Sequence, residues 1–143
     1  MDIDELKRQI TFDGVQVMEH AGDTFYIYDP HGDLPPERQM PFITIVTGDH
    51  HDDASQLAEP GTYRLNIGLT KATFAARFRQ DGEIDHAARD VVMPHPVYAG
   101  QHWVCVVNPA DIAALRPLLA EAYQYAVRKY GNYQARRLDH SGQ

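Results

Sequence analysis

Two stretches decide the fold class of this chain: Phe42-Ile43-Thr44-Ile45-Val46-Thr47 and Thr62-Tyr63-Arg64-Leu65-Asn66-Ile67-Gly68. The first is β-branched and almost continuously apolar, which is typical of a strand. The second alternates apolar side chains with Arg64 and Asn66, as in a sheet that has one face toward water. Both stretches therefore predict strands of a sheet with one hydrophobic face.

The rest of the chain places further strands and helices around this pair. Strands are expected at residues 15–18, 24–28 and 103–107, the first two forming a hairpin. Helices are expected at 2–11, 71–79 and 116–130, with a short turn of helix near 109–115, while the sequence leaves open whether residues 85–90 form a short helix. Gln80-Asp81-Gly82 and Gly131 are expected to end the second and the last long helix. This order predicts an α+β fold, a largely antiparallel sheet with helices packed on one face.

The length of the chain and its charge distribution limit the number of domains and the kinds of partner that we expect. We expect residues 1–131 to form a single domain and residues 132–143 a frayed tail. Residues 1–111 carry 8 basic and 18 acidic side chains (8 − 18 = −10), and residues 112–143 carry 5 and 2 (5 − 2 = +3). An acidic body repels phosphate backbones, which disfavours nucleic acid as a partner.

The same composition bears on the compartment. No apolar run reaches the roughly 20 residues that a bilayer-spanning helix needs. The N-terminus is acidic and lacks the pattern of a signal peptide. The single cysteine, Cys105, cannot form an internal disulfide. We therefore expect a cytoplasmic protein without membrane association.

A proline-braced loop from Pro94 to Trp103 holds the candidate binding residues. They combine imidazole and aromatic groups, which suit a pocket with an apolar wall and a polar handle: His95, Tyr98, His102 and Trp103. The alternative is a structural role, in which His95 is a buried histidine hydrogen-bonded to a carbonyl group and Trp103 anchors the last strand. Whether the Met93-Pro94 or His95-Pro96 bond is cis stays open.

The sequence gives only weak evidence for a metal site or a reactive cysteine. Divalent metals bind imidazole and carboxylate groups, and the chain offers His50, His51, Asp52, Asp53, His86, His95 and His102. No defined metal-binding spacing joins them, so we expect a solvated histidine-rich loop, no metal site and no cofactor. Cys105 lies in an apolar strand and is expected to be an inert core residue.

Several motifs together resemble a known bacterial family of unknown function. They are Tyr63-Arg64-Leu65-Asn66-Ile67-Gly68, Pro94-His95-Pro96-Val97-Tyr98 and Leu118-Leu119-Ala120-Glu121-Ala122-Tyr123. That family in turn resembles the YjbR/MmcQ-like proteins. The second resemblance implies a fold similar to YjbR-like and CyaY (frataxin)-like folds, and it suggests DNA binding.

These observations favour a non-enzymatic module that binds a small molecule or a protein at the Pro94–Trp103 loop. Weak nucleic-acid binding, which the YjbR resemblance and the basic C-terminal segment suggest, is one alternative. A metal-dependent enzyme that uses the histidine residues is the other. The ligand and the oligomeric state are not fixed by the sequence.

Overall fold

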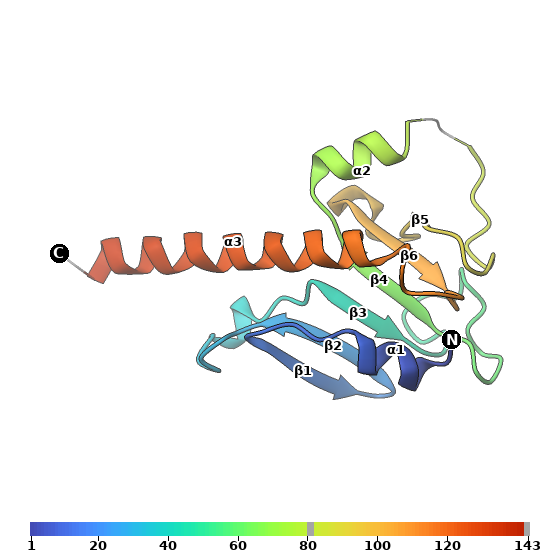
Figure 1. The fold of residues 1–143 in the computed structure, drawn as a ribbon, viewed down its shortest axis with the longest axis horizontal. Helices are drawn as coiled ribbons and strands as arrows, with labels where there is room; N and C mark the ends of the chain where they lie inside the picture. The colour runs from blue at the N-terminus through green and yellow to red at the C-terminus, as the bar shows by residue number, and fades with distance from the viewer. Residues whose placement is uncertain (80–81, 142–143) are drawn as a thin grey trace.

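Two β-branched strands, β3 (Ile43–Val46) and β4 (Arg64–Gly68), lie at the centre of a six-stranded sheet. The computed structural model describes residues 1–79 and 82–141, and Figure 1 shows the sheet with a long helix lying across it. The strand order is β1-β2-β3-β4-β6-β5, and every neighbouring pair is antiparallel. The predicted α+β class and antiparallel sheet are confirmed.

The outer strands follow the predicted positions closely. The hairpin of β1 (Val15–His20) and β2 (Asp23–Tyr28) turns at Ala21 and Gly22, both with positive φ. Strand β6 (Trp103–Val107) has the predicted bounds. Strand β5 (Met93–Pro94) was expected to be loop. It lies at the edge of the sheet, where a proline without an N–H is tolerated.

Within the residues that the structure describes, three α-helices and two 3₁₀ turns complete the fold. Helix α1 spans Ile3–Gln9 and is capped by the Asp2 carboxylate, which accepts a bond from the Glu5 N–H at 2.8 Å. Helix α2 spans Lys71–Arg77, and the side chain of Thr70 caps it. Helix α3 spans Arg116–Ser141, and the 3₁₀ turns are η1 (Pro36–Arg38) and η2 (Ala99–Gln101).

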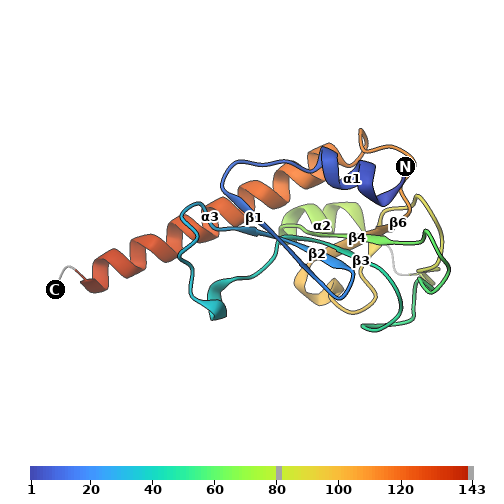
Figure 2. The same cartoon turned by 90° about the horizontal axis from the view of Figure 1, so that it is seen from below.

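The hydrophobic core lies between one face of the sheet and the helices. Figure 2 shows α1 and α3 on the same side of the strands, as expected. Leu6 of α1 and Ile45 and Leu65 of the sheet have no exposed surface. Leu118, Leu119 and Ala122 of α3 close this core. Tyr26 belongs to it as well.

Some expected helix ends are wrong. Helix α3 continues through Gly131 to Ser141, because glycine lowers helix stability without stopping a helix that has good formers on both sides. Residues 85–90 form a turn and a bend in place of a short helix, whereas the 109–115 segment contains the expected helical turn, in which the Leu115 and Arg116 N–H groups donate to the Ile112 carbonyl oxygen. The expected stop at Gln80-Asp81 lies outside the described residues.

Proline at the second position of α3 fits the helix start. Pro117 is the second residue of α3, directly after Arg116. A backbone N–H at this position has no partner within the helix in any case, so proline loses no helical hydrogen bond there. The described residues contain no cis peptide bond. Among them, no helix is both long enough and apolar enough to cross a membrane.

We predict that Gly131→Ala stabilises α3 locally by about 1 kcal/mol, because a methyl group inside a helix lowers the entropy cost of glycine. A Cβ at Gly131 would meet nothing within 4 Å. Amide hydrogen exchange next to residue 131 should slow about fivefold. Gly61→Ala is the control: its φ of +82 strains any side chain, so the same methyl should destabilise the protein. Faster exchange after Gly131→Ala would contradict the continuous helix.

Candidate functional site

The face of the sheet opposite the helices carries polar side chains from β3 and β4. Successive strand residues point to opposite faces, so Thr44, Arg64 and Asn66 face away from the core that holds Ile45 and Leu65. The Asn66 side-chain amide donates a hydrogen bond to Thr44 Oγ1 at 2.9 Å. This face is therefore the polar floor of a site, built from the two central strands.

Arg64 is the central residue of this floor and is only 2% exposed. Its guanidinium and Nε atoms donate to Asp52 Oδ1 and Oδ2 at 3.0 and 2.8 Å, to Ser55 Oγ at 3.0 Å and to Asn66 Oδ1 at 3.1 Å. These contacts use four of the five N–H donors of an arginine. The bidentate geometry with Asp52 is the strong form of an arginine–carboxylate pair.

The Arg64–Asp52 pair is ionised. Hydrogen bonds from Arg64 hold the pKa of the Asp52 carboxyl below its usual value, while partial burial opposes them and the Arg64 charge adds to them. Asp52 lies in the loop after β3 and Arg64 at the start of β4. The ion pair thus holds this loop against the sheet.

His95 is a buried neutral imidazole with a defined tautomer. It is 4% exposed, and its Nδ1 accepts hydrogen bonds from the Val97 and Tyr98 backbone N–H groups, both at 3.0 Å. A ring nitrogen that accepts carries no proton, so the single proton of the neutral ring is on Nε2. Burial lowers the pKa of His95 to about 4, with a further contribution from the Arg64 charge.

This tautomer leaves two hydrogen-bond donors side by side. Nε2 of His95 lies 3.4 Å from Nη2 of Arg64, and neither group can accept from the other. An oxygen about 2.9 Å from both nitrogens is compatible with ordinary hydrogen-bond geometry. The pair can therefore hold one acceptor oxygen of a bound molecule.

These groups line a cavity of about 480 Å³. Its volume is within the range of small-molecule sites. Aromatic and aliphatic side chains form much of its wall, and polar groups lie on its floor. The lining residues are Phe25, Met40, Pro41, Thr44, Val46, His51, Asp52, Arg64, Asn66, His95, Val97, Tyr98, Gln101 and Trp103.

The structure brings three of the four expected binding residues to this cavity. His95, Tyr98 and Trp103 line it, and the His95 and Tyr98 rings lie 5.0 Å apart. His102 is not among the lining residues; its ring packs 5.7 Å from Phe74 in an edge arrangement. Its backbone is left-handed, with φ of 69, which turns the chain from η2 into β6.

Glycine at position 68 allows the Trp103 indole to approach the sheet. The two residues are cross-strand partners on β4 and β6. A Cβ on Gly68 would lie 3.0 Å from Trp103 Cε2, closer than ordinary packing. The indole therefore rests on the β4 backbone and forms one wall of the cavity.

Cys105 belongs to the packed interior. It has no exposed surface, and its thiol lies 3.9 Å from the Pro94 carbonyl oxygen. Burial raises the pKa of this thiol to about 12. A thiol that stays protonated is a poor nucleophile, so the geometry agrees with the expected core role.

Of the residues considered as metal ligands, the structure brings only His50 and His51 together. Their Nε2 atoms lie 2.7 and 2.8 Å from the same oxygen, Oδ2 of Asp23. The other candidate ligands have different surroundings. Asp52 binds Arg64, His86 Nε2 lies 3.0 Å from the Pro94 carbonyl oxygen, and Asp53 is exposed.

The sequence did not single out Arg64, Asn66 or Asp23 as functional, and it offered Asp52 only as a weakly indicated metal ligand. Arg64 and Asn66 are polar residues in an otherwise apolar strand, and alternation alone places them on a water-exposed face. One sequence signal could have identified Arg64 and Asn66. They belong to one of the motifs that carry the family resemblance, and the proline-braced histidine loop is another of those motifs. Asp23 gave no signal, because it directly follows a turn and lies 27 positions before its partner His50.

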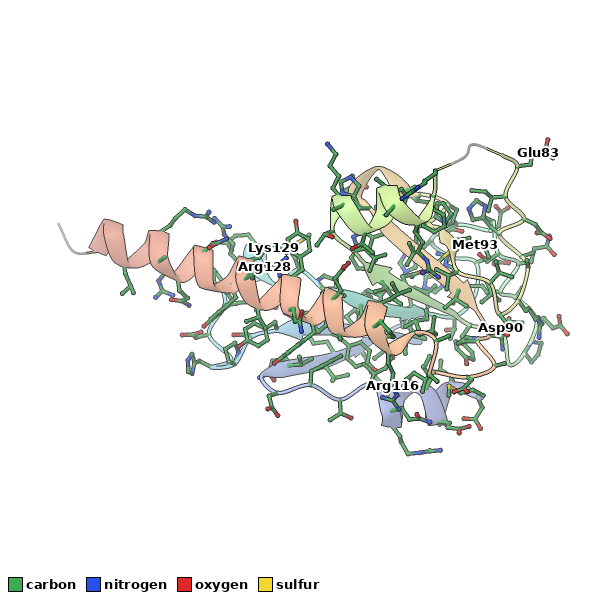
Figure 3. The ribbon with its side chains drawn as sticks, turned by 45° about the horizontal axis from the view of Figure 1, so that its top comes forward. Glu83, Asp90, Met93, Arg116, Arg128 and Lys129 are labelled. Carbon is green, nitrogen blue, oxygen red and sulfur yellow. The ribbon has the colours of Figure 1, made fainter. Side chains whose placement is uncertain are left out.

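The labelled basic residues in the middle of α3 lie away from this site (Figure 3). Arg128 and Lys129 lie midway along α3, well away from Met93 of β5. Each packs its cationic end over the Tyr125 ring, at 5.4 and 4.3 Å from the centroid. The basic C-terminal segment is thus part of the helical layer and makes no contribution to the cavity.

The fold and the site define an α+β domain with a polar pocket on the face of its sheet opposite the helices. The chain belongs to the DUF6194 family, a family of unknown function whose model matches residues 1–136. No curated protein and no solved structure matches the chain. The membership agrees with the expected family of unknown function, and no link to the YjbR/MmcQ-like proteins is found.

We predict that Asp52→Asn destabilises the protein by about 3 kcal/mol, because it leaves the buried guanidinium of Arg64 without its counter-charge. Urea denaturation at neutral pH measures the change. Glu59→Gln is the matched control, since its carboxylate is 74% exposed and lies 3.6 Å from Arg89. A surface pair of that kind contributes at most about 1 kcal/mol. Equal losses in the two variants would contradict a structural role for the buried pair.

Proposed function

We propose that this protein binds a small molecule with an apolar or aromatic body and a carbonyl or carboxylate oxygen. The observation that carries the proposal is the pair of adjacent donors on His95 Nε2 and Arg64 Nη2, 3.4 Å apart. Both residues line the cavity. An acceptor oxygen between them would satisfy two buried donors at once, which gives a strong preference for molecules that carry one.

The cavity walls support an apolar body for the ligand. Phe25, Val46 and Trp103 flank the polar floor, and Tyr98 lies at its exposed edge, with 53% of its surface exposed. Aromatic walls with a few placed polar groups are typical of sites for small organic molecules. His95, Tyr98 and Trp103 are thus the binding residues of the proposal, together with Arg64 and Asn66.

The proposal is for binding without catalysis. The Arg64 charge is already balanced by Asp52, and His95 is a neutral donor with a pKa of about 4. A general base works best with a pKa near the operating pH. Cys105 is buried with a protonated thiol, so it does not supply a nucleophile. We further propose that residues 1–131 form a single domain, from which the last turns of α3 extend.

We predict that benzoate and acetophenone, which carry an acceptor oxygen, raise the melting temperature and change the fluorescence of the protein. Trp103 is the single tryptophan and lines the cavity, so its emission reports occupancy directly. Ethylbenzene has a similar body without an acceptor and should bind at least about tenfold more weakly, one missing hydrogen bond to a charged donor being worth roughly 1.5–3 kcal/mol.

His95→Asn tests the site without undoing its loop. The Asn side-chain oxygen can replace Nδ1 as acceptor for the Val97 and Tyr98 N–H groups, but no donor then occupies the place of Nε2. This variant should lose the preference for acetophenone over ethylbenzene. His102→Asn is the control, because asparagine tolerates left-handed backbone and His102 lies outside the lining. Binding that is absent in the wild type, or indifferent to His95→Asn, would contradict the proposal.

A further inference from the structure

A second cluster lies where the ends of β2 and β3 meet, at the edge of the cavity. Asp23 begins β2, while His50 and His51 lie in the loop after β3. Both imidazole Nε2 atoms lie within hydrogen-bond distance of Asp23 Oδ2, at 2.7 and 2.8 Å. The two rings are tilted against each other, with centroids 4.3 Å apart. Three potential ligand atoms from two segments thus converge on one point.

We propose that Asp23, His50 and His51 bind a divalent transition-metal ion, with zinc as the ion best suited to the ligand set. One carboxylate oxygen and two imidazole nitrogens are the ligand types of zinc sites that keep a coordination position open. The three ligand atoms all lie within 4.8 Å of one another. The proposal does not depend on the small-molecule function proposed above.

The burial of Asp23 is the independent reason to expect a cation. The residue is 1% exposed, and a buried carboxylate is costly unless a positive charge or several donors offset it. Within the described residues, its ion-pair partners are His50 and His51. The two imidazoles and the Thr47 N–H supply hydrogen bonds to this carboxylate, and a bound dication would add a full positive charge beside it.

The carboxylate is also held in one orientation before any ion binds. Its other oxygen, Oδ1, accepts the Thr47 backbone N–H at 2.9 Å. Thr47 Oγ1 in turn donates to the Gly22 carbonyl oxygen at 3.1 Å, which ties the β2 hairpin to the end of β3. Outer hydrogen bonds of this kind orient metal ligands and raise affinity.

Small movements would convert the present arrangement into a coordination sphere. Ligand bonds of about 2.0–2.2 Å in a tetrahedral zinc site separate neighbouring ligand atoms by about 3.4 Å. The observed 2.7 and 2.8 Å therefore need to open by about 0.6–0.7 Å. The His50 and His51 side chains are 41% and 54% exposed, so their loop has room to move and the ion has a path from solvent.

One of the three proposed ligands also borders the cavity. His51 and its neighbour Asp52 both line that cavity. Three protein ligands leave at least one position for a water or for an oxygen of a bound molecule. We therefore infer an accessible metal site of the open type.

Metal titration of the full chain, prepared without a histidine tag and stripped with a chelator, tests the proposal. Co²⁺ added to the wild-type protein should produce the visible absorption of a four- or five-coordinate complex at one equivalent. Zn²⁺ should displace it and raise the melting temperature. His50→Ala and His51→Ala should each weaken Co²⁺ binding by more than the roughly 10–100-fold that an outer partner costs.

His31→Ala is the matched control, because His31 is another exposed histidine, and it should bind as the wild type does. His50 and His51 are exposed, so their variants are expected to fold, which circular dichroism checks. Asp23→Asn is a less direct variant, since Asp23 also anchors Thr47. The absence of a Co²⁺ complex in the wild type, or equal binding by the wild type and the His50→Ala and His51→Ala variants, would overturn the proposal.

Discussion

A guanidinium buried within the sheet is the constraint on which the rest of this structure depends. Arg64 is 2% exposed, and a charge at that depth requires a counter-charge and nearly complete hydrogen bonding. Asp52 supplies the charge with two contacts, while Ser55 and Asn66 supply acceptors. The loop between β3 and β4 must therefore fold back over the polar face of the sheet.

That fold-back arranges the neighbouring groups. With Asp52 fixed on Arg64, the adjacent His50 and His51 are brought to Asp23, at the end of the β1–β2 hairpin. On the other side of the guanidinium, His95 meets Nη2 with its own Nε2 proton. One buried charge thus connects the floor of the proposed small-molecule site with the proposed metal site. The helices stabilise the opposite face, so this face is covered by loops and not by a helix.

The sequence predicted the fold where the signal is local. Strand β6 was predicted with its observed bounds because Trp103–Val107 is short, apolar and follows a proline-rich loop. Helix α3 begins at the predicted Arg116, but its predicted end at Gly131 was wrong, because glycine is a weak stop without the left-handed geometry of a cap. Strand β5 was missed because two residues carry no periodicity.

The site was predictable only in part, for a physical reason. The proline-braced loop indicated His95, Tyr98 and Trp103, and all three line the cavity. Their polar partners come from other segments: Arg64 from β4 and Asp52 from a loop 12 residues earlier. His50 and His51 lacked a recognisable spacing, because their common partner Asp23 is supplied by the pairing of β2 with β3. Contacts created by strand pairing leave no pattern along the chain.

The central claim is that His95 stands beside Arg64 as a neutral donor, and nitrogen NMR of the imidazole tests it most directly. The ¹⁵N shifts of His95, followed from pH 8 to pH 3.5 with ¹⁵N-labelled histidine, reveal which ring nitrogen carries the proton. The expected result is an Nε2–H tautomer at neutral pH and a pKa of about 4. An Nδ1–H tautomer, or an imidazolium already present at pH 6.5, would contradict it.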